Sequence, residues 1–230
     1  MIYAIADLHG CYEQYLELLE LIRFRPEDHL YVLGDVIDRG NGGIFILLDM
    51  MERENVTLLA GNHEHMAVNN MRLLTGDQTM QEHLLFNNDH LLWMVNGGRS
   101  TEDTFLELSP EKQRAIIEYI KSAPLRMKVR AGERLFHLSH TLPPWDPDGK
   151  WDNAPWIDYL WGEVSYDKTY REGVFYVTGH CPTGLIDPEK IGQIICRNNH
   201  IAIDCGTVFG NPLGCICLDT LEEYYTKSCG

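Results

Sequence analysis

Three polar runs of this chain each follow an apolar segment: Asp7-Leu8-His9-Gly10, Gly34-Asp35-Val36-Ile37-Asp38-Arg39-Gly40 and Gly61-Asn62-His63-Glu64. The apolar segments, at residues 1–6, 30–33 and 56–59, have the length and composition of buried β-strands. Apolar residues at helical spacing come after each run, at residues 11–23, 44–54 and 65–74. Strands that alternate with helices predict a sheet of parallel strands covered on both faces. Ligands bind beyond the carboxyl ends of such strands, which is where all three polar runs lie.

The rest of the chain changes character twice. Residues 75–123 are polar and helical and predict an inserted cap, in which residues 111–121 form a helix that Ser109 caps and Pro110 begins. Short strand-like segments follow at residues 126–129, 135–139, 175–178, 193–196, 200–204 and 214–218. They predict a second sheet, mixed or antiparallel. We therefore expect a single α/β domain over residues 1–230, with a helical cap insertion at about residues 75–123.

Composition restricts the partners of this protein. The formal net charge is −15, and long-range repulsion would oppose an encounter with nucleic acid or with anionic membranes, so we expect neither partner. The first 30 residues show no basic stretch followed by an apolar run and a cleavage site. No apolar stretch reaches the roughly 18 residues of a spanning helix. We therefore expect a soluble, unprocessed protein in the cytoplasm.

The seven cysteines lack a CxxC pair and the regular spacing of a disulfide framework. A reduced set of thiols is therefore expected, in keeping with a cytoplasmic location. Cys215 and Cys217 alternate with other apolar residues, which is typical of small side chains on one face of a strand. The alternative is a zinc site formed by these two thiols.

The polar runs carry side chains that can hold two metal ions. Asp7 and His9 end the first strand together, so both can turn toward one ion. Asp35 ends the next strand and can bridge two ions through its carboxylate. Asn62 follows the third strand and offers an amide oxygen to the second ion.

Two histidines later in the chain are candidates for the remaining ligands. His140 follows the strand-like segment 135–139, and His180 follows the strand-like segment that begins at residue 175. Imidazole mixed with carboxylate fits manganese, iron or zinc better than magnesium alone.

These residues resemble the motifs of the metal-dependent phosphoprotein phosphatases, a branch of the calcineurin-like metallophosphoesterases. DxHG, GDxxDRG and GNHE occur in order, so the resemblance covers residues 1 to about 218 and includes the bacterial and phage-type protein serine/threonine phosphatases. It implies a four-layer α-β-β-α sandwich and two divalent metal ions, manganese foremost. The implied ligands are Asp7, His9 and Asp35 for the first ion, and Asp35, Asn62, His140 and His180 for the second.

The residues and the resemblance agree on the catalytic roles. A water shared by two ions would attack phosphorus in line, without a covalent phosphoenzyme. His63 would protonate the leaving oxygen, Asp38 would orient that imidazole, and Arg39 would clamp a phosphate oxygen. Glu64 is interpreted as a hydrogen-bond acceptor behind the metal ligands. We therefore expect a phosphomonoester hydrolase, above all a protein serine/threonine phosphatase, acting on a phosphorylated protein or a small phosphorylated substrate.

Two positions depart from the family pattern and leave the substrate open. Ala60 stands where protein phosphatases carry an arginine before GNH, and Glu163 lies where phage-like members place another arginine. Arg99, in the turn Asn96-Gly97-Gly98-Arg99, is interpreted either as a compensating substrate contact or as a surface residue.

The departures also admit two alternative functions. Diadenosine tetraphosphate hydrolases lack the arginine before GNH as well, so a dinucleoside polyphosphate is the alternative substrate. Four aromatic residues could stack on its base: Trp145, Trp151, Trp156 and Tyr159. The other alternative is a non-catalytic, metal-stabilised module whose cap binds a partner protein.

Overall fold

The computed structural model describes residues 1–76, 80–146, 148–149 and 153–228, with the backbone alone for residues 80–87. Trp151 lies outside the described residues, so its interpretation as a stacking residue does too. Two five-stranded sheets form the centre of the fold, in the orders β10-β9-β1-β2-β3 and β4-β5-β6-β8-β7. In the described ranges, no helix is both long enough and apolar enough to cross a lipid bilayer.

The first sheet contains the three predicted strand and helix repeats. Its parallel strands are β1 (Ile2–Ile5), β2 (His29–Val32) and β3 (Val56–Leu58), followed respectively by α1 (Tyr12–Leu21), α2 (Gly43–Met51) and α3 (Asn62–Leu74). Helix α3 begins earlier than predicted, so Asn62 and His63 lie in its first turn. The Glu64 carboxylate accepts the Gly61 N–H at 2.9 Å, and this bond satisfies a donor at the helix start.

The prediction that residues 214–218 join the second sheet is wrong. Strand β9 (Gly214–Cys217) pairs antiparallel with β1, with Cys217 opposite Tyr3, and β10 (Glu223–Tyr225) extends the same sheet. Cys215 and Cys217 are buried against the helices, and Ile216 faces the space between the sheets. The interpretation of the two cysteines as small apolar side chains is confirmed. A strand that is apolar on both faces fits either sheet, so local sequence could not select the partner.

The second sheet is mixed, as predicted. Its strands are β4 (Arg126–Ala131), β5 (Arg134–Ser139), β6 (Val174–Thr178), β8 (His200–Ala202) and β7 (Ile195–Arg197). Strands β5, β6 and β8 run parallel to one another, and the edge strands β4 and β7 are antiparallel to their neighbours. The carboxyl ends of β5 and β6 therefore lie at one edge of the sheet, as do those of β1 and β2 in the first sheet.

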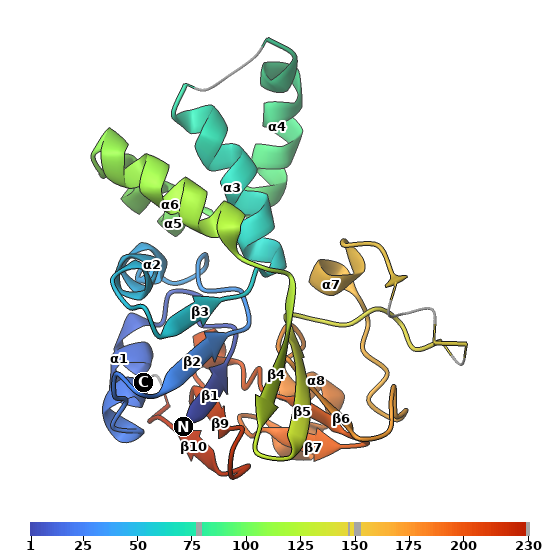
Figure 1. Cartoon of the computed structure of the whole chain (residues 1–230). Coiled ribbons are helices and arrows are strands. Elements are labelled where there is room, and N and C mark those ends of the chain that lie inside the picture. Colours follow the sequence, from blue (N-terminus) through green and yellow to red (C-terminus); the bar gives the residue numbers. More distant parts are fainter. Residues whose placement is uncertain (77–79, 147, 150–152, 229–230) are drawn as a thin grey trace.

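The two sheets face each other and confirm the predicted sandwich (Figure 1). Apolar residues from both sheets meet between them, among them Ala4, Leu33, Phe136 and Val177. Helices α1 and α2 bury their apolar faces against the outer side of the first sheet. The outer side of the second sheet is covered mainly by irregular chain with the one-turn helix α7 (Asp158–Trp161), so this layer is less helical than the resemblance implied. Shorter elements complete the fold: α8 (Thr183–Ile186) and the 3₁₀ helices η2 (Pro188–Lys190) and η3 (Thr207–Phe209).

The predicted insertion consists of α4 (Met80–Val95), α5 (Arg99–Leu106) and α6 (Pro110–Ser122). The Ser109 hydroxyl caps α6 by accepting the Lys112 N–H, and Pro110 is its first residue, as predicted. With α3, these helices form a group at the top of Figure 1. Trp93 and Phe105 are buried in the same apolar cluster as Leu8 and the helices of the first sheet, so the insertion shares its core with the rest of the fold.

We predict that His200 makes the protein sensitive to acid. Its ring contacts Tyr176 of β6, and also Tyr166 and Tyr170 of the chain that precedes this strand. Burial, with a smaller effect of Arg197, lowers the pKa of His200 to about 4. In the unfolded chain, the His200 imidazole takes up a proton near pH 6.5, whereas in the folded protein it does so only near pH 4. The contribution of neutral His200 to the free energy of unfolding should therefore be fully present above pH 6.5 and fall by roughly 3 kcal/mol as the pH drops toward 4.

Urea unfolding of the wild type and of His200→Phe at several pH values measures this effect. The phenylalanine variant should lose less stability between pH 6.5 and 4, because it has no imidazole to protonate. The same pH dependence in both proteins would contradict the prediction.

Candidate functional site

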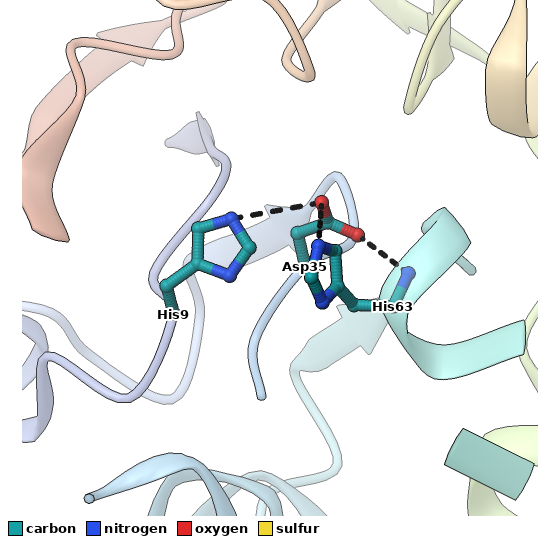
Figure 2. Close-up of side chains that lie close together, drawn as sticks. All are labelled: His9, Asp35 and His63. Carbon is teal, nitrogen blue, oxygen red and sulfur yellow. Dashed lines mark hydrogen bonds and ion pairs between the residues drawn. The ribbon is translucent and has the colours of Figure 1, made fainter. Parts of the chain in front are cut away.

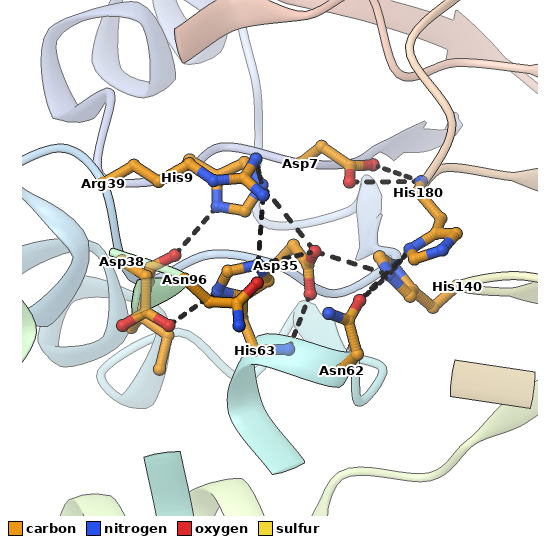
Figure 3. Close-up of polar contacts among 12 residues, drawn as sticks. Asp7, His9, Asp35, Asp38, Arg39, Asn62, His63, Asn96, His140 and His180 are labelled. Carbon is orange, nitrogen blue, oxygen red and sulfur yellow. Dashed lines mark hydrogen bonds and ion pairs between the residues drawn. The ribbon is translucent and has the colours of Figure 1, made fainter. Parts of the chain in front are cut away.

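The six predicted metal ligands meet where the carboxyl ends of the two sheets adjoin (Figure 3). They follow β1, β2, β3, β5 and β6, in order: Asp7, His9, Asp35, Asn62, His140 and His180. Backbone bonds join the first two loops, since Asp7 N–H donates to the Gly34 carbonyl at 3.1 Å and His9 N–H donates to that of Asp35 at 2.8 Å. The site is thus built from both sheets.

Strained backbone is concentrated in this site. Ten non-glycine residues of the described chain have a positive φ, and six of them are predicted site residues: Asp7, His9, Asp35, Asp38, Arg39 and His180. A positive φ is unfavourable for residues with a side chain and persists only where surrounding contacts enforce it. The backbone conformations that orient these side chains therefore lower the stability of the fold, which is common at functional sites.

Glycines allow the carboxylates to approach neighbouring backbone closely. A Cβ at Gly179 would overlap the Asp7 carboxylate, and a Cβ at Gly61 would overlap that of Asp35. The glycines of the GNHE run and of the segment before His180 therefore make room for two predicted ligands.

Asp35 belongs to two groups of possible metal ligands. In the first group, shown in Figure 2, the Asp35 Oδ2 atom lies 3.7 Å from His9 Nε2 and 3.9 Å from His63 Nε2. The second group comprises Asp35, His140 and His180, with His140 Nε2 at 3.4 Å from the same carboxylate oxygen. One carboxylate thus lies between both groups, as a bridging ligand would.

At the second group, two hydrogen-bond acceptors face each other with no proton between them: His140 Nε2 and Asn62 Oδ1. His140 Nδ1 donates to the Leu33 carbonyl at 2.8 Å, and burial lowers the pKa of His140, so its Nε2 carries a lone pair. That Nε2 faces Asn62 Oδ1 at 2.9 Å, which is also an acceptor. Two acceptors this close repel unless a cation lies near them, so the donor set fits a metal ion.

His9 has the same arrangement in the first group. Its Nδ1 donates to the Ile37 carbonyl at 3.0 Å, and burial lowers its pKa to about 3. The neutral ring therefore presents the Nε2 lone pair to the site. A backbone bond at one ring nitrogen that fixes the other as a ligand is common around metals.

Asp7 lies beside these groups and is joined to them by backbone. Its carboxylate accepts the His180 N–H, at 2.9 Å to one oxygen and 3.1 Å to the other. Burial, with Asp204 and Asp35, raises the pKa of Asp7 well above its ordinary value. A nearby divalent cation would favour the ionised form instead. Its role as a ligand stays a prediction.

Sequence reasoning missed Asp204. This carboxylate is buried just beyond β8, accepts the Gly206 N–H at 2.8 Å, and has its pKa raised to about 7, chiefly by burial. Its charge helps to raise the pKa of Asp7, so the two carboxylates interact. The available signal was its position at the end of a buried strand, the same rule that identified Asp7 and Asp35.

His63 and Asp38 form a close pair at the edge of the first group. His63 Nδ1 and Asp38 Oδ2 are 2.6 Å apart, and both side chains are buried. The other nitrogen, His63 Nε2, faces the site. The charges of Asp35 and Asp38 raise the pKa of His63 although burial opposes the shift.

Arg39 brings a positively charged side chain to the site. Its Nη1 donates to His9 Nε2 at 2.7 Å, and its Nη2 lies 3.3 Å from His63 Nε2. The side chain is nevertheless exposed, with its guanidinium 5.8 Å from the centre of the Phe209 ring, so a substrate can reach it. Glu64 lies on the opposite side, where its carboxylate accepts the backbone N–H of Asp35, Val36 and Gly61, as its interpretation as an acceptor requires.

Arg99 and Glu163 are not members of either ligand group. Arg99 is 74% exposed, and its guanidinium lies 3.6 Å from both Glu102 and Asp103 of its own helix, so its role as a substrate contact stays a prediction. Glu163 lines a hollow of about 390 Å³ together with His180 and Trp161.

The aromatic residues suggested for base stacking have other partners. Trp145 Nε1 donates to the Thr169 carbonyl at 3.2 Å, and the Tyr159 ring lies under the Arg126 guanidinium. The Trp156 ring contacts that of His65, beside a hollow of about 300 Å³ that Ala60 also lines. Base stacking by these residues stays a prediction.

Comparison with known proteins identifies the family of this chain. The family model described as calcineurin-like phosphoesterase matches residues 1–206. The asymmetrical bis(5'-nucleosyl)-tetraphosphatase PrpE of Oceanobacillus iheyensis is 25% identical over 91% of this chain and 85% of its own length. Serine/threonine-protein phosphatase 1 of Salmonella typhimurium is 27% identical over 62% of this chain and 59% of its own length. The symmetrical tetraphosphatase of Nitrosomonas europaea is 42% identical, but the match spans only 24% of that protein and 27% of this chain.

Solved structures agree with the fold. A structure provisionally assigned as a diadenosine tetraphosphatase superposes with a TM-score of 0.61 at 15% identity, over 98% of this chain and 92% of that one. A protein serine/threonine phosphatase from Saccharomyces cerevisiae gives 0.57 at 14% identity, over 100% of this chain and 80% of that one. The family match over most of the chain, together with this fold, shows that the protein belongs to the calcineurin-like phosphoesterases.

Proposed function

We propose that this protein is a two-metal phosphomonoesterase whose preferred substrates are phosphoserine and phosphothreonine in proteins. The observation that carries the proposal is the placement of the Asp35 carboxylate among His9, His140 and His180. The His63 and Asp38 pair lies at one side of it, as does Arg39. His63 and Asp38 are poised for proton transfer, which a purely structural metal site would not need. The similarity to a serine/threonine phosphatase supports the substrate class.

The chain's own residues can bind the phosphate and complete the reaction. When bound, two divalent ions supply an activated water and polarise the phosphoryl group. Arg39 binds non-bridging phosphate oxygens through its planar guanidinium. As the bond from water oxygen to phosphorus forms and the bond to the leaving oxygen breaks, His63 Nε2 gives its proton to that oxygen. Asp38 holds Nδ1 of the same ring at 2.6 Å, so Nε2 points toward the substrate.

Hydrolysis of dinucleoside polyphosphates is the second candidate function. One relative, which matches over 91% of this chain and 85% of its own length, is named as an asymmetrical tetraphosphatase. Ala60 and Glu163 also leave the site without the two arginines usual in the protein phosphatases that the sequence resembles. A single exposed arginine can bind the phosphoryl group under attack in either kind of substrate.

A direct comparison of substrates tests the proposal. With manganese or iron added, kcat/KM for phosphoserine and phosphothreonine peptides should exceed that for diadenosine tetraphosphate. The reverse order would favour the second candidate, and no hydrolysis with either metal would favour the non-catalytic module.

Replacement of His63 should slow the reaction strongly. His63→Asn removes the proton donor and should lower kcat for a phosphoserine peptide roughly 100- to 10,000-fold. His29→Asn is the matched control, because His29 lies at the start of β2 and bonds to Thr57. A wild-type rate in His63→Asn would remove His63 from the mechanism.

Metal content should depend on His140. His140→Ala removes one member of the second ligand group, so elemental analysis of protein purified with manganese should show about one ion per chain in place of about two. His29→Ala should leave the metal content unchanged. An unchanged content in His140→Ala would show that this histidine holds no ion.

The negative charge of Glu163 should weaken phosphate binding. Glu163 and His180 line the same hollow, so the carboxylate acts on an incoming phosphate at short range. Glu163→Gln should lower KM for phosphopeptides about two- to fivefold at low salt and less at high salt, as screening predicts. Glu20→Gln, on the exposed face of α1, is the control for net charge. An unchanged KM would place the carboxylate outside the substrate's path.

A further inference from the structure

We infer that Trp93 and Thr101, from the helical insertion, are positioning residues that act on the reaction through Asp38. The inference rests on the proposed role of His63 as proton donor. It gives the insertion a part in the chemistry itself, distinct from covering the site or binding a partner. Trp93 lies near the end of α4, and Thr101 lies in the first turn of α5.

The Asp38 carboxylate receives hydrogen bonds from both helices. The Trp93 indole N–H lies 3.0 Å from each carboxylate oxygen, and the Thr101 hydroxyl donates to Oδ1 at 2.7 Å. His63 Nδ1 takes the remaining position, at 2.6 Å from Oδ2. The two insertion residues therefore determine which carboxylate oxygen faces the imidazole, and in which direction.

Thr101 also holds the backbone of Asp38. Its hydroxyl oxygen accepts the Asp38 N–H at 2.9 Å while its proton bonds to the carboxylate of the same residue. Asp38 has a φ of 70°, an unfavourable conformation that needs such contacts to persist. One side chain thus fixes both ends of Asp38.

Further contacts join the same short segment to the loop that follows Asp38. Arg39 N–H donates to the Gly97 carbonyl at 2.9 Å, and the Ser100 hydroxyl donates to the Gly40 carbonyl at 2.9 Å. The segment 93–101 therefore binds the Asp38 loop through hydrogen bonds from both side chains and backbone.

Burial makes these bonds consequential. Asp38 and Trp93 are fully buried, and Thr101 is nearly so. A buried carboxylate that loses a donor cannot replace it readily with water, so it turns toward its remaining partners or becomes less favourable to bury. Gly98 accommodates the indole, because a Cβ there would lie 2.5 Å from Trp93 Nε1. The packing thus holds the N–H in place over the carboxylate.

Dependence on the leaving group separates this role from simple stabilisation. The alkoxide of serine is a poor leaving group that needs a proton, whereas p-nitrophenolate leaves without one. A misplaced His63 therefore slows hydrolysis of a phosphoserine peptide much more than that of p-nitrophenyl phosphate. Damage to the metal site or to the fold would slow both substrates alike.

The experiment uses Trp93→Phe, which keeps a ring but removes the N–H, and Thr101→Val, which keeps the shape but removes the hydroxyl. In the full chain with manganese, each should lower kcat for the phosphoserine peptide about tenfold or more, with KM unchanged, since positioned proton transfer is worth roughly 100- to 10,000-fold. The rate with p-nitrophenyl phosphate should change less than about threefold. Thr101→Ser, which keeps the hydroxyl, should retain the wild-type rates.

Thr104→Val is the matched control on the same helix, because the Thr104 hydroxyl donates to the Ser100 carbonyl. A double mutant gives the decisive comparison. If Trp93 acts through His63, Trp93→Phe should have no further effect on peptide hydrolysis in a His63→Asn background. Thermal unfolding and metal content of each variant show that the fold and the ions are retained, and if one variant fails to fold the other carries the test.

Three results would overturn the inference. These are equal losses with both substrates, an undiminished effect of Trp93→Phe in the His63→Asn background, or wild-type peptide rates in both variants. If His63→Asn itself shows the dependence on the leaving group and the insertion variants do not, the proposed function stands and the inference fails. If the wild type hydrolyses neither substrate with manganese or iron, the proposed function fails first.

Discussion

The position of the Asp35 carboxylate is the constraint on which the rest of the site depends. Its backbone N–H donates to Glu64 at 2.8 Å, and its Oδ1 accepts the His63 N–H at 3.0 Å, so the start of α3 holds both ends of the residue. Its Oδ2 is left to face imidazoles of both ligand groups. Burial alone would raise the pKa of Asp35, but His63 lowers it through the charge of its ring and through its backbone N–H. The carboxylate therefore stays ionised, as a bridging metal ligand must.

The fold stabilises a site that is unfavourable by itself. Buried carboxylates, neutral histidines and left-handed backbone all cost free energy, and they persist because well-packed apolar layers surround them. The cluster between the sheets fixes the ends of β1, β2, β5 and β6 relative to one another. The cluster under the helices fixes the start of α3 and the insertion. The candidate site is consequently buried at most of the predicted ligands and exposed at Arg39.

The departures of this chain from the family pattern concern residues beside the candidate metal ligands, not the ligands themselves. Asp35 belongs to two groups of possible metal ligands, whereas Ala60 and Glu163 stand where the resemblance described above implies arginine. Glu163 shares a hollow with His180, so its charge is felt at the site. The loop that carries Arg39, the phosphate-binding residue of the proposed function, is held by contacts with the insertion.

Sequence alone determined the strand and helix repeats of the first sheet and selected six polar residues that the fold brings together, because apolar periodicity and strand-end polar residues are local signals. It also identified the capped helix α6 through Ser109 and Pro110. It could not assign β9 to the first sheet, because a strand apolar on both faces has no local mark of its partner. Nor could it link Trp93 or Thr101 to Asp38, 55 and 63 residues away, since only tertiary packing brings α4 and α5 onto that loop. Tertiary structure likewise decided that Asp204 raises the pKa of Asp7, because the long-range pairing of β6 with β8 brings the end of β8 to the site.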